Sequence, residues 1–142
     1  MENKLFPGIE SLLRRLFEKG SRLYVATAKL EPYAIKVLVN FGLYDFFLDI
    51  AGADYHGVKA GKEEILLSLM QRNGIFNPDA VVLVGDSRFD IDAAAAAGID
   101  SIGVAYGFST YEEMESYNPD YLVRSVDELT ALLTGPDAIQ GS

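Results

Sequence analysis

The chain of 142 residues contains no cysteine, so it forms neither disulfides nor thiolate metal sites. Basic residues are scarce, because 12 lysines and arginines stand against 21 acidic residues and leave a net charge of −9. This balance argues against binding to nucleic acid or to an anionic membrane surface, since both reward clustered positive charge. A small anionic substrate stays compatible, because a few local donors are enough to hold one phosphate.

Long hydrophobic runs are also missing. No apolar run reaches the roughly 20 residues that span a bilayer, and the opening stretch "MENKLFPGIE" has no signal-peptide pattern. We therefore expect no membrane segment and a cytoplasmic location. The length suits a single domain, so we expect one core over residues 1–134 and a flexible tail over residues 135–142.

Apolar residues recur at helical spacing in five segments: 9–20, 32–41, 62–72, 89–97 and 125–133. Short apolar runs lie between them and read as strands: 22–27, 46–50, 80–85, 101–106 and 120–123. This alternation predicts βαβ units and an α/β fold whose parallel sheet is covered on both faces. The run "VVLV" (81–84) is apolar at every position and predicts a central strand. Residues 111–117 carry three glutamates and are expected to form a solvated amphipathic turn.

Two positions suggest an anion site, because ligands of open parallel sheets bind at the carboxyl ends of the strands. Thr27, in "VATAK", falls where a strand should end before a helix, and its hydroxyl and the nearby N–H groups could hold an anion. The alternative is a threonine in a turn or cap. Lys62 falls in the first turn of a helix, where the macrodipole disfavours positive charge. A solvated surface lysine is the alternative there, and Lys59 could take the same role.

Two carboxylates follow the run "VVLV" in the stretch "GDSRFD". Gly85 permits a tight turn, Asp86 then lies at the edge of the sheet, and Asp90 follows one helical turn later. Carboxylates so close together are costly unless they bind a cation or cap a helix, and hard oxygen ligands of this kind suit Mg²⁺. The alternative is that Asp86 is only the N-cap of the next helix.

A strand-end threonine (Thr27), a helix-start lysine (Lys62) and the strand-end stretch "GDSRFD" occur in this order with βα units between them. Together they resemble the haloacid dehalogenase superfamily of phosphohydrolases. Four longer stretches are similar to its phosphoglycolate phosphatase branch, including the 5′-nucleotidase-like relatives: "LFPGIESLLRRLFEKGSRLYVATAK", "FGLYDFFLDIAGAD", "AAAGIDSIGVAYGFST" and "DYLVRSVDELTALL". The resemblance runs from about Leu5 to Leu133. It implies a three-layer, Rossmann-like core.

The resemblance also implies roles for particular residues. In this family an aspartate on the first strand attacks the phosphorus, and a second aspartate two residues later is the general acid and base. Asp86 matches the aspartate that binds Mg²⁺, and Asp90 matches the one that supports this metal shell. Lys62 matches the catalytic lysine that neutralises nucleophile and phosphate. The residues expected to bind substrate are Thr27, Ala28, Lys29 and Lys62.

The sequence departs from the family at its first motif. No strand ending in Asp-x-Asp precedes "LFPG", and the only Asp-x-Asp, Asp90 to Asp92, falls inside a predicted helix. The helical cap is missing too. We therefore expect an incomplete core without its first, central strand, so that two apolar strands lose a shared neighbour. Exposed strand edges invite association, and we expect a marginally stable chain, an oligomer, or a partner chain that supplies the strand.

Three interpretations follow. The first is the carboxy-terminal part of a Mg²⁺-dependent phosphatase core for a small phosphomonoester, such as phosphoglycolate or a nucleotide monophosphate, inactive or nearly so alone. The second is a non-catalytic module that binds phosphate, Mg²⁺ or a partner and is completed in trans. The third is an incomplete gene prediction or an expression fragment.

Overall fold

The structure, a computed structural model, describes residues 6–53, 61–107 and 109–135. The chain divides into two compact units, Met1–Gly74 and Ile75–Ser142, and each is described by itself. The single core predicted over residues 1–134 stays a prediction. The predicted tail lies, apart from Gly135, outside the described residues.

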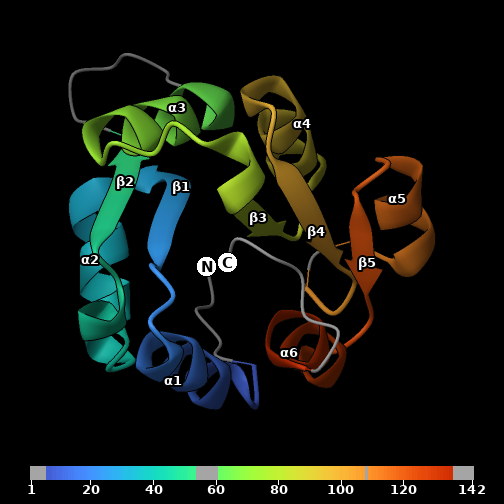
Figure 1. The fold of residues 1–142 in the computed structure, drawn as a ribbon, viewed down its shortest axis with the longest axis horizontal. Coiled ribbons are helices and arrows are strands. Elements are labelled where there is room, and N and C mark those ends of the chain that lie inside the picture. The colour runs from blue at the N-terminus through green and yellow to red at the C-terminus, as the bar shows by residue number, and fades with distance from the viewer. Residues whose placement is uncertain (1–5, 54–60, 108, 136–142) are drawn as a thin grey trace. The chain divides into compact units, whose positions relative to one another are not determined.

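In its described residues, the first unit contains two parallel strands and three α-helices, which Figure 1 shows. Its elements, in chain order, are α1 (Ile9–Lys19), β1 (Tyr24–Leu30), α2 (Glu31–Asn40), the 3-10 turn η1 (Tyr44–Phe46), β2 (Asp49–Ala53) and α3 (Lys62–Arg72). Helix α3 buries Ile65 and Leu69 against Ala51 of β2, and the partly buried Tyr24 and Ala26 of β1 pack on the same cluster. Strand β2 starts three residues later than predicted, because Tyr44–Phe46 form the 3-10 turn.

The second unit contains a three-stranded parallel sheet in the order β3-β4-β5. Its elements are η2 (Pro78–Ala80), β3 (Val82–Gly85), α4 (Arg88–Ala97), β4 (Asp100–Val104), α5 (Tyr111–Ser116), β5 (Tyr121–Val123) and α6 (Val126–Thr134). The middle strand, β4, buries four of its five residues, Ser101 to Val104. The parallel α/β class and the five predicted helices are therefore confirmed.

The prediction that "VVLV" forms a central strand is wrong for this chain. Among the residues that the structure describes, β3 pairs with β4 alone, so it is an edge strand, and Val84 is 40% exposed. Strand β1 likewise pairs with β2 alone within the described ranges. An apolar strand with one described neighbour is what the sequence leads us to expect of an incomplete parallel core.

The solvated turn predicted over residues 111–117 is also wrong. The segment forms α5, with a capping box in which Thr110 and Glu113 exchange hydrogen bonds. Its Met114 is fully buried against β4, where Gly103 leaves room for it: a Cβ on Gly103 would lie 2.5 Å from the Met114 sulfur. The prediction rested on the three glutamates, which are exposed, and did not consider Met114, the one buried residue of the helix.

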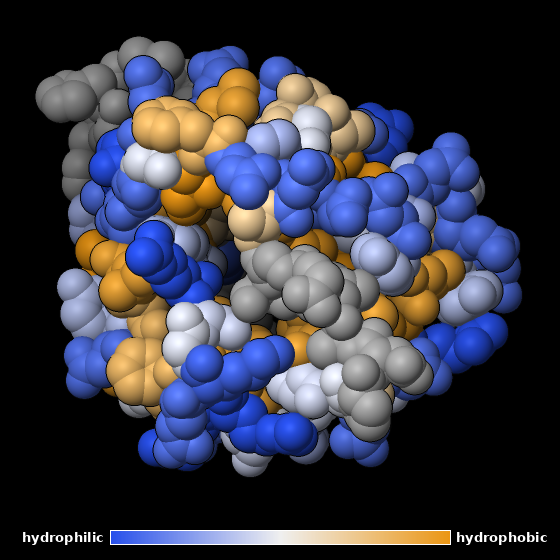
Figure 2. Space-filling view, viewed as in Figure 1, coloured by the Kyte–Doolittle hydropathy of each residue, from blue (hydrophilic) through white to orange (hydrophobic). Residues whose placement is uncertain are grey.

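Hydrophilic side chains cover much of the face that Figure 2 shows, interrupted by small apolar patches. Within the described residues, no helix is both long enough and apolar enough to cross a membrane.

Candidate functional site

The carboxyl end of β1 contains a bulge at the predicted phosphate-binding segment. Ala26 pairs with Ala51 and Leu30 with Ala53, so β1 takes four steps where β2 takes two. The extra residues fall in Thr27–Lys29, and the Thr27 hydroxyl oxygen accepts a hydrogen bond from the Lys29 N–H at 3.2 Å. Bulges change the direction of side chains and are over-represented beside active sites. The structure therefore places Thr27, Ala28 and Lys29 together in one irregular segment.

Lys29 and Lys62 are the two lysines of the first unit that the sequence predicts to bind phosphate. The Lys29 ammonium lies 5.5 Å from the centroid of the Tyr33 ring, a cation–π distance. Lys62 is the first residue of α3, and two glutamates follow it in the first turn. This position confirms that Lys62 begins a helix, whereas the competing Lys59 lies outside the described residues.

In the second unit, Asp90 locks the turn that follows β3. One of its carboxylate oxygens, Oδ2, accepts from the Asp86 N–H at 3.1 Å, the Ser87 N–H at 3.2 Å and the Ser87 hydroxyl at 3.1 Å. The Asp90 side chain is buried, since the residue is only 6% exposed. Gly85 is required beside it, because a Cβ there would lie 2.2 Å from the Asp90 Cβ. The N-cap of α4 is Ser87, not Asp86, so the alternative role of Asp86 as a cap is wrong.

Two residues that follow β4, Gly107 and Ser109, lie close to Asp86, and the sequence did not predict this. A Cβ on Gly107 would lie 3.0 Å from Asp86 Oδ2, and the Ser109 hydroxyl donates to the Asp86 carbonyl oxygen at 3.0 Å. Burial, and then the charge of Asp86, raise the pKa of the Tyr106 hydroxyl. A signal was available, because Gly107 directly follows the predicted strand 101–106, and ligand sites of parallel sheets occur at the carboxyl ends of strands.

The predicted site residues are divided between the two units. Thr27, Ala28, Lys29 and Lys62 belong to the first unit, and Asp86 and Asp90 to the second. Across the described ranges, no cluster of three or more His, Cys, Asp or Glu residues could hold a metal ion. The Asp-x-Asp at Asp90–Asp92 lies in α4, and Asp92 is exposed there, so it does not end a strand. The roles assigned to these residues stay predictions.

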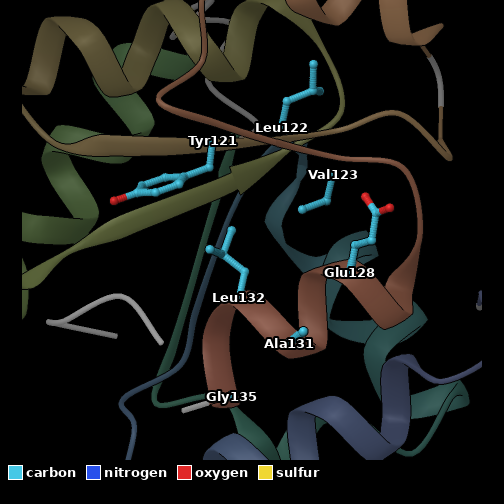
Figure 3. A pocket seen from close by; sticks show the side chains of 7 residues that line it. All are labelled: Tyr121, Leu122, Val123, Glu128, Ala131, Leu132 and Gly135. Atoms are coloured by element: carbon cyan, nitrogen blue, oxygen red, sulfur yellow. The ribbon is translucent and has the colours of Figure 1, made fainter. Parts of the chain in front are cut away.

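A separate hollow of about 450 Å³ lies between β5 and α6 (Figure 3). Its lining is mostly apolar and includes Tyr121, Leu122 and Leu132, with the Glu128 carboxylate at one side. None of the predicted site residues lines it. The hollow therefore adds nothing to the candidate phosphate or metal residues.

A family model described as haloacid dehalogenase-like hydrolase matches residues 1–104. The chain belongs to this family. The resemblance based on "VATAK", Lys62 and "GDSRFD" is therefore confirmed. The similarity to phosphoglycolate phosphatases and 5′-nucleotidases is confirmed by the relatives described next.

Three relatives show how much of the family fold is present. The chain is 34% identical to phosphoglycolate phosphatase of Escherichia coli K12, covering 93% of this chain and 52% of the relative. It is 31% identical to a 5′-nucleotidase of Pseudomonas aeruginosa, and the match covers 93% of this chain and 59% of the relative. It is 37% identical to the tyrosine-protein kinase PtkA of Mycobacterium tuberculosis, and the match covers 92% of this chain and 45% of the relative. The solved PtkA structure matches with a TM-score of 0.74, covering 92% of this chain and 61% of that one. The chain thus spans about half the length of the curated relatives that it matches.

Proposed function

We propose that the chain is part of a phosphomonoester hydrolase core. Its phosphate-binding residues would be Thr27–Lys29 and Lys62, and its magnesium-binding residues Asp86 and Asp90. The observation that carries the proposal is the locked turn after β3, in which a buried Asp90 takes three hydrogen bonds and fixes the backbone at Asp86. A turn of this kind at the carboxyl end of a parallel strand places a carboxylate where such sheets bind ligands. The family and the phosphatase and nucleotidase relatives support the same chemistry.

In this proposal the first unit binds the phosphoryl group. The bulge Thr27–Lys29 offers a hydroxyl, backbone N–H groups and one ammonium to the phosphoryl oxygens. Lys62 at the start of α3 adds a second positive charge, which neutralises the charge that develops during transfer. The net charge of −9 means that these few local donors, and not a general field, would attract the anion.

The donor set also fits Mg²⁺. This ion is commonly held by one or two carboxylates and completes its shell with waters and substrate phosphate oxygens. Asp86 would be the direct ligand, whereas Asp90 uses Oδ2 to hold the turn and so would position Asp86. When bound, the ion would compensate the charge of the phosphate and of the attacking group.

We further propose that these 142 residues alone turn over substrate slowly or not at all. A nucleophilic aspartate at a strand end is needed to form the aspartyl-phosphate, and the only Asp-x-Asp lies within α4. Phosphoglycolate and nucleotide monophosphates are the proposed substrate class, on the basis of the relatives' names. PtkA is named a kinase, so phosphoryl transfer is what the three names share.

The test combines ligand binding with turnover. We expect Mg²⁺ to shift the amide NMR signals of residues 85–90, with an affinity at least about tenfold lower in Asp86→Asn, since a charged ligand is lost. Asp92→Asn, which changes an exposed carboxylate on the same helix, is the matched control. Hydrolysis of p-nitrophenyl phosphate should stay at background. Mg²⁺ shifts that survive Asp86→Asn would overturn the metal proposal, and robust turnover abolished by Asp86→Asn would overturn the proposed inactivity.

A second candidate function is a binding module completed in trans. It is favoured by the two apolar strands that have one partner each among the described residues, β1 in the first unit and β3 in the second. The occupant would be an extended apolar segment ending in Asp-x-Asp, paired by backbone hydrogen bonds. Mixing the chain with the separately produced amino-terminal half of the P. aeruginosa 5′-nucleotidase should produce Mg²⁺-dependent phosphatase activity. No binding and no activity in that mixture would count against completion in trans.

A further inference from the structure

Arg72, the last residue of α3, contacts three groups at once. Its Nε donates to Asp49 Oδ2 at 2.6 Å, and its Nη2 donates to Asp49 Oδ1 at 2.9 Å and to the Ile50 carbonyl oxygen at 2.7 Å. The same Nη2 lies 3.6 Å from Glu31 Oε1. A bidentate guanidinium–carboxylate pair fixes orientation as well as charge. Arg72 therefore ties the end of α3 to the start of β2 and to the first residue of α2.

Asp49 is the centre of this network. Besides Arg72, it accepts from the Asn73 side-chain amide at 2.7 Å and from the Ile50 N–H at 2.8 Å. The hydrogen bond from Arg72 is the main cause that holds the pKa of Asp49 below its usual value, and Asp49 in turn raises the pKa of Arg72. A single exposed ion pair contributes little stability. Several directed bonds to one carboxylate instead define a geometry.

Gly52 connects this network to the bulge. Its N–H donates to Glu31 Oε1 at 3.3 Å, and a Cβ on Gly52 would lie only 2.6 Å from the Lys29 carbonyl oxygen. Gly52 also lies between Ala51 and Ala53, the two register points between which β1 has its extra residues. The backbone that leaves the bulge thus rests on β2, and Glu31 holds it there.

We propose that Asp49, Arg72 and Glu31 are positioning residues that set the conformation of the Thr27–Lys29 bulge. We call these three residues the α3 clamp. The α3 clamp holds the chain that leaves the bulge through Glu31, and it fixes the helix whose first residue is Lys62. The significance for phosphate binding rests on the proposed function, because Thr27, Lys29 and Lys62 are its phosphate ligands. The positioning itself is a property of the first unit and can be tested without a ligand.

The test is amide hydrogen exchange on the full chain with Arg72→Gln, which removes the bidentate pair and the charge near Glu31. We expect exchange of the Gly52 and Lys29 amides to become about tenfold faster, as for the loss of one net hydrogen bond. The amide of Leu69, inside the core of α3, should keep its protection. Arg14→Gln is the matched control, because it breaks an exposed ion pair with Glu10 (3.1 Å) on α1 of the same unit.

Two outcomes would overturn the α3 clamp: unchanged exchange at Gly52 and Lys29, or an equal acceleration of all amides of the first unit, which is the sign of a merely structural pair. Asp49→Asn, which keeps the shape of the side chain, provides the same readout should Arg72→Gln not fold.

A titration with inorganic phosphate separates the α3 clamp from the proposed phosphate site. If the amides of residues 27–29 in the unchanged chain do not respond to phosphate, the phosphate site fails, while the exchange result still decides the α3 clamp. If they respond, we expect Arg72→Gln to weaken phosphate affinity several-fold, and an unchanged affinity would overturn the link between the α3 clamp and the bulge.

Discussion

At the scale of single residues, the Asp90 carboxylate stabilises the turn after β3 by accepting hydrogen bonds from its backbone. Its buried Oδ2 accepts three hydrogen bonds from the turn at Asp86 and Ser87. Asp90→Asn removes the charge that strengthens these bonds, so we expect the free energy of unfolding to fall by about 2 kcal/mol. Urea unfolding measures this loss. Asp92→Asn, on the exposed side of α4, should change it by less than about 0.5 kcal/mol, and equal effects of the two variants would contradict the assigned role.

Asp49 makes the stability of the first unit depend on pH at the acid end. Because the folded-state pKa lies below the ordinary value of 3.8, the unfolded chain binds more protons there and stability rises with pH. The contribution of Asp49 is present above pH 3.8 and is lost as the pH falls through the lowered folded-state value. Acid unfolding curves should therefore be less steep for Asp49→Asn between pH 4 and about 2. Curves of the same steepness with and without Asp49 would show that the pair with Arg72 does not persist in solution.

At the scale of elements, α5 is attached to its sheet by one side chain. Met114 is fully buried over Gly103, whereas Glu112 and Glu113 on the same helix are exposed. We expect Met114→Ala to cost about 2–4 kcal/mol in the free energy of unfolding, since it leaves a cavity between α5 and β4. Glu112→Ala is the control, and a near-neutral effect is expected for it. A Met114→Ala chain as stable as the control would mean that α5 is only loosely associated with β4.

At the scale of the whole molecule, the unshared strand edges predict association. Val84 on β3 is 40% exposed on a strand that has one partner among the described residues. An exposed apolar edge is a template for pairing with another chain, and a lysine on such an edge opposes this pairing. We expect light scattering after size exclusion to show concentration-dependent oligomers that Val84→Lys reduces.

Val39→Lys is the matched control for this experiment. Val39 is 56% exposed but lies on α2, so the substitution removes the same apolar side chain without changing a strand edge. We expect Val39→Lys to leave the association unchanged. A monodisperse monomer with ordinary two-state unfolding would contradict the prediction, and equal effects of both variants would assign the association to general hydrophobicity.

The sequence predicted most of the elements because local signals agree with the fold. Helical spacing located five helices, and Gly85 with its two aspartates located the turn after β3. Helix α5 was not predicted because its six residues make fewer than two helical turns, so its one buried methionine has no second apolar residue to repeat with. That β3 has a single neighbour among the described residues was not predicted, because an apolar run does not show how many neighbours a strand has.

The sequence alone determined the α/β class, the family and the identity of the candidate residues, because periodicity and motif spacing are local properties of the chain. Only the tertiary structure showed the β1 bulge, the contacts of Arg72 with Asp49 and Glu31, and the approach of Gly107 and Ser109 to Asp86. Each of these depends on contacts between residues about 20 or more positions apart, such as Asp49 with Arg72 and Asp86 with Ser109. Such contacts are set by strand pairing and packing, which no short window of sequence contains.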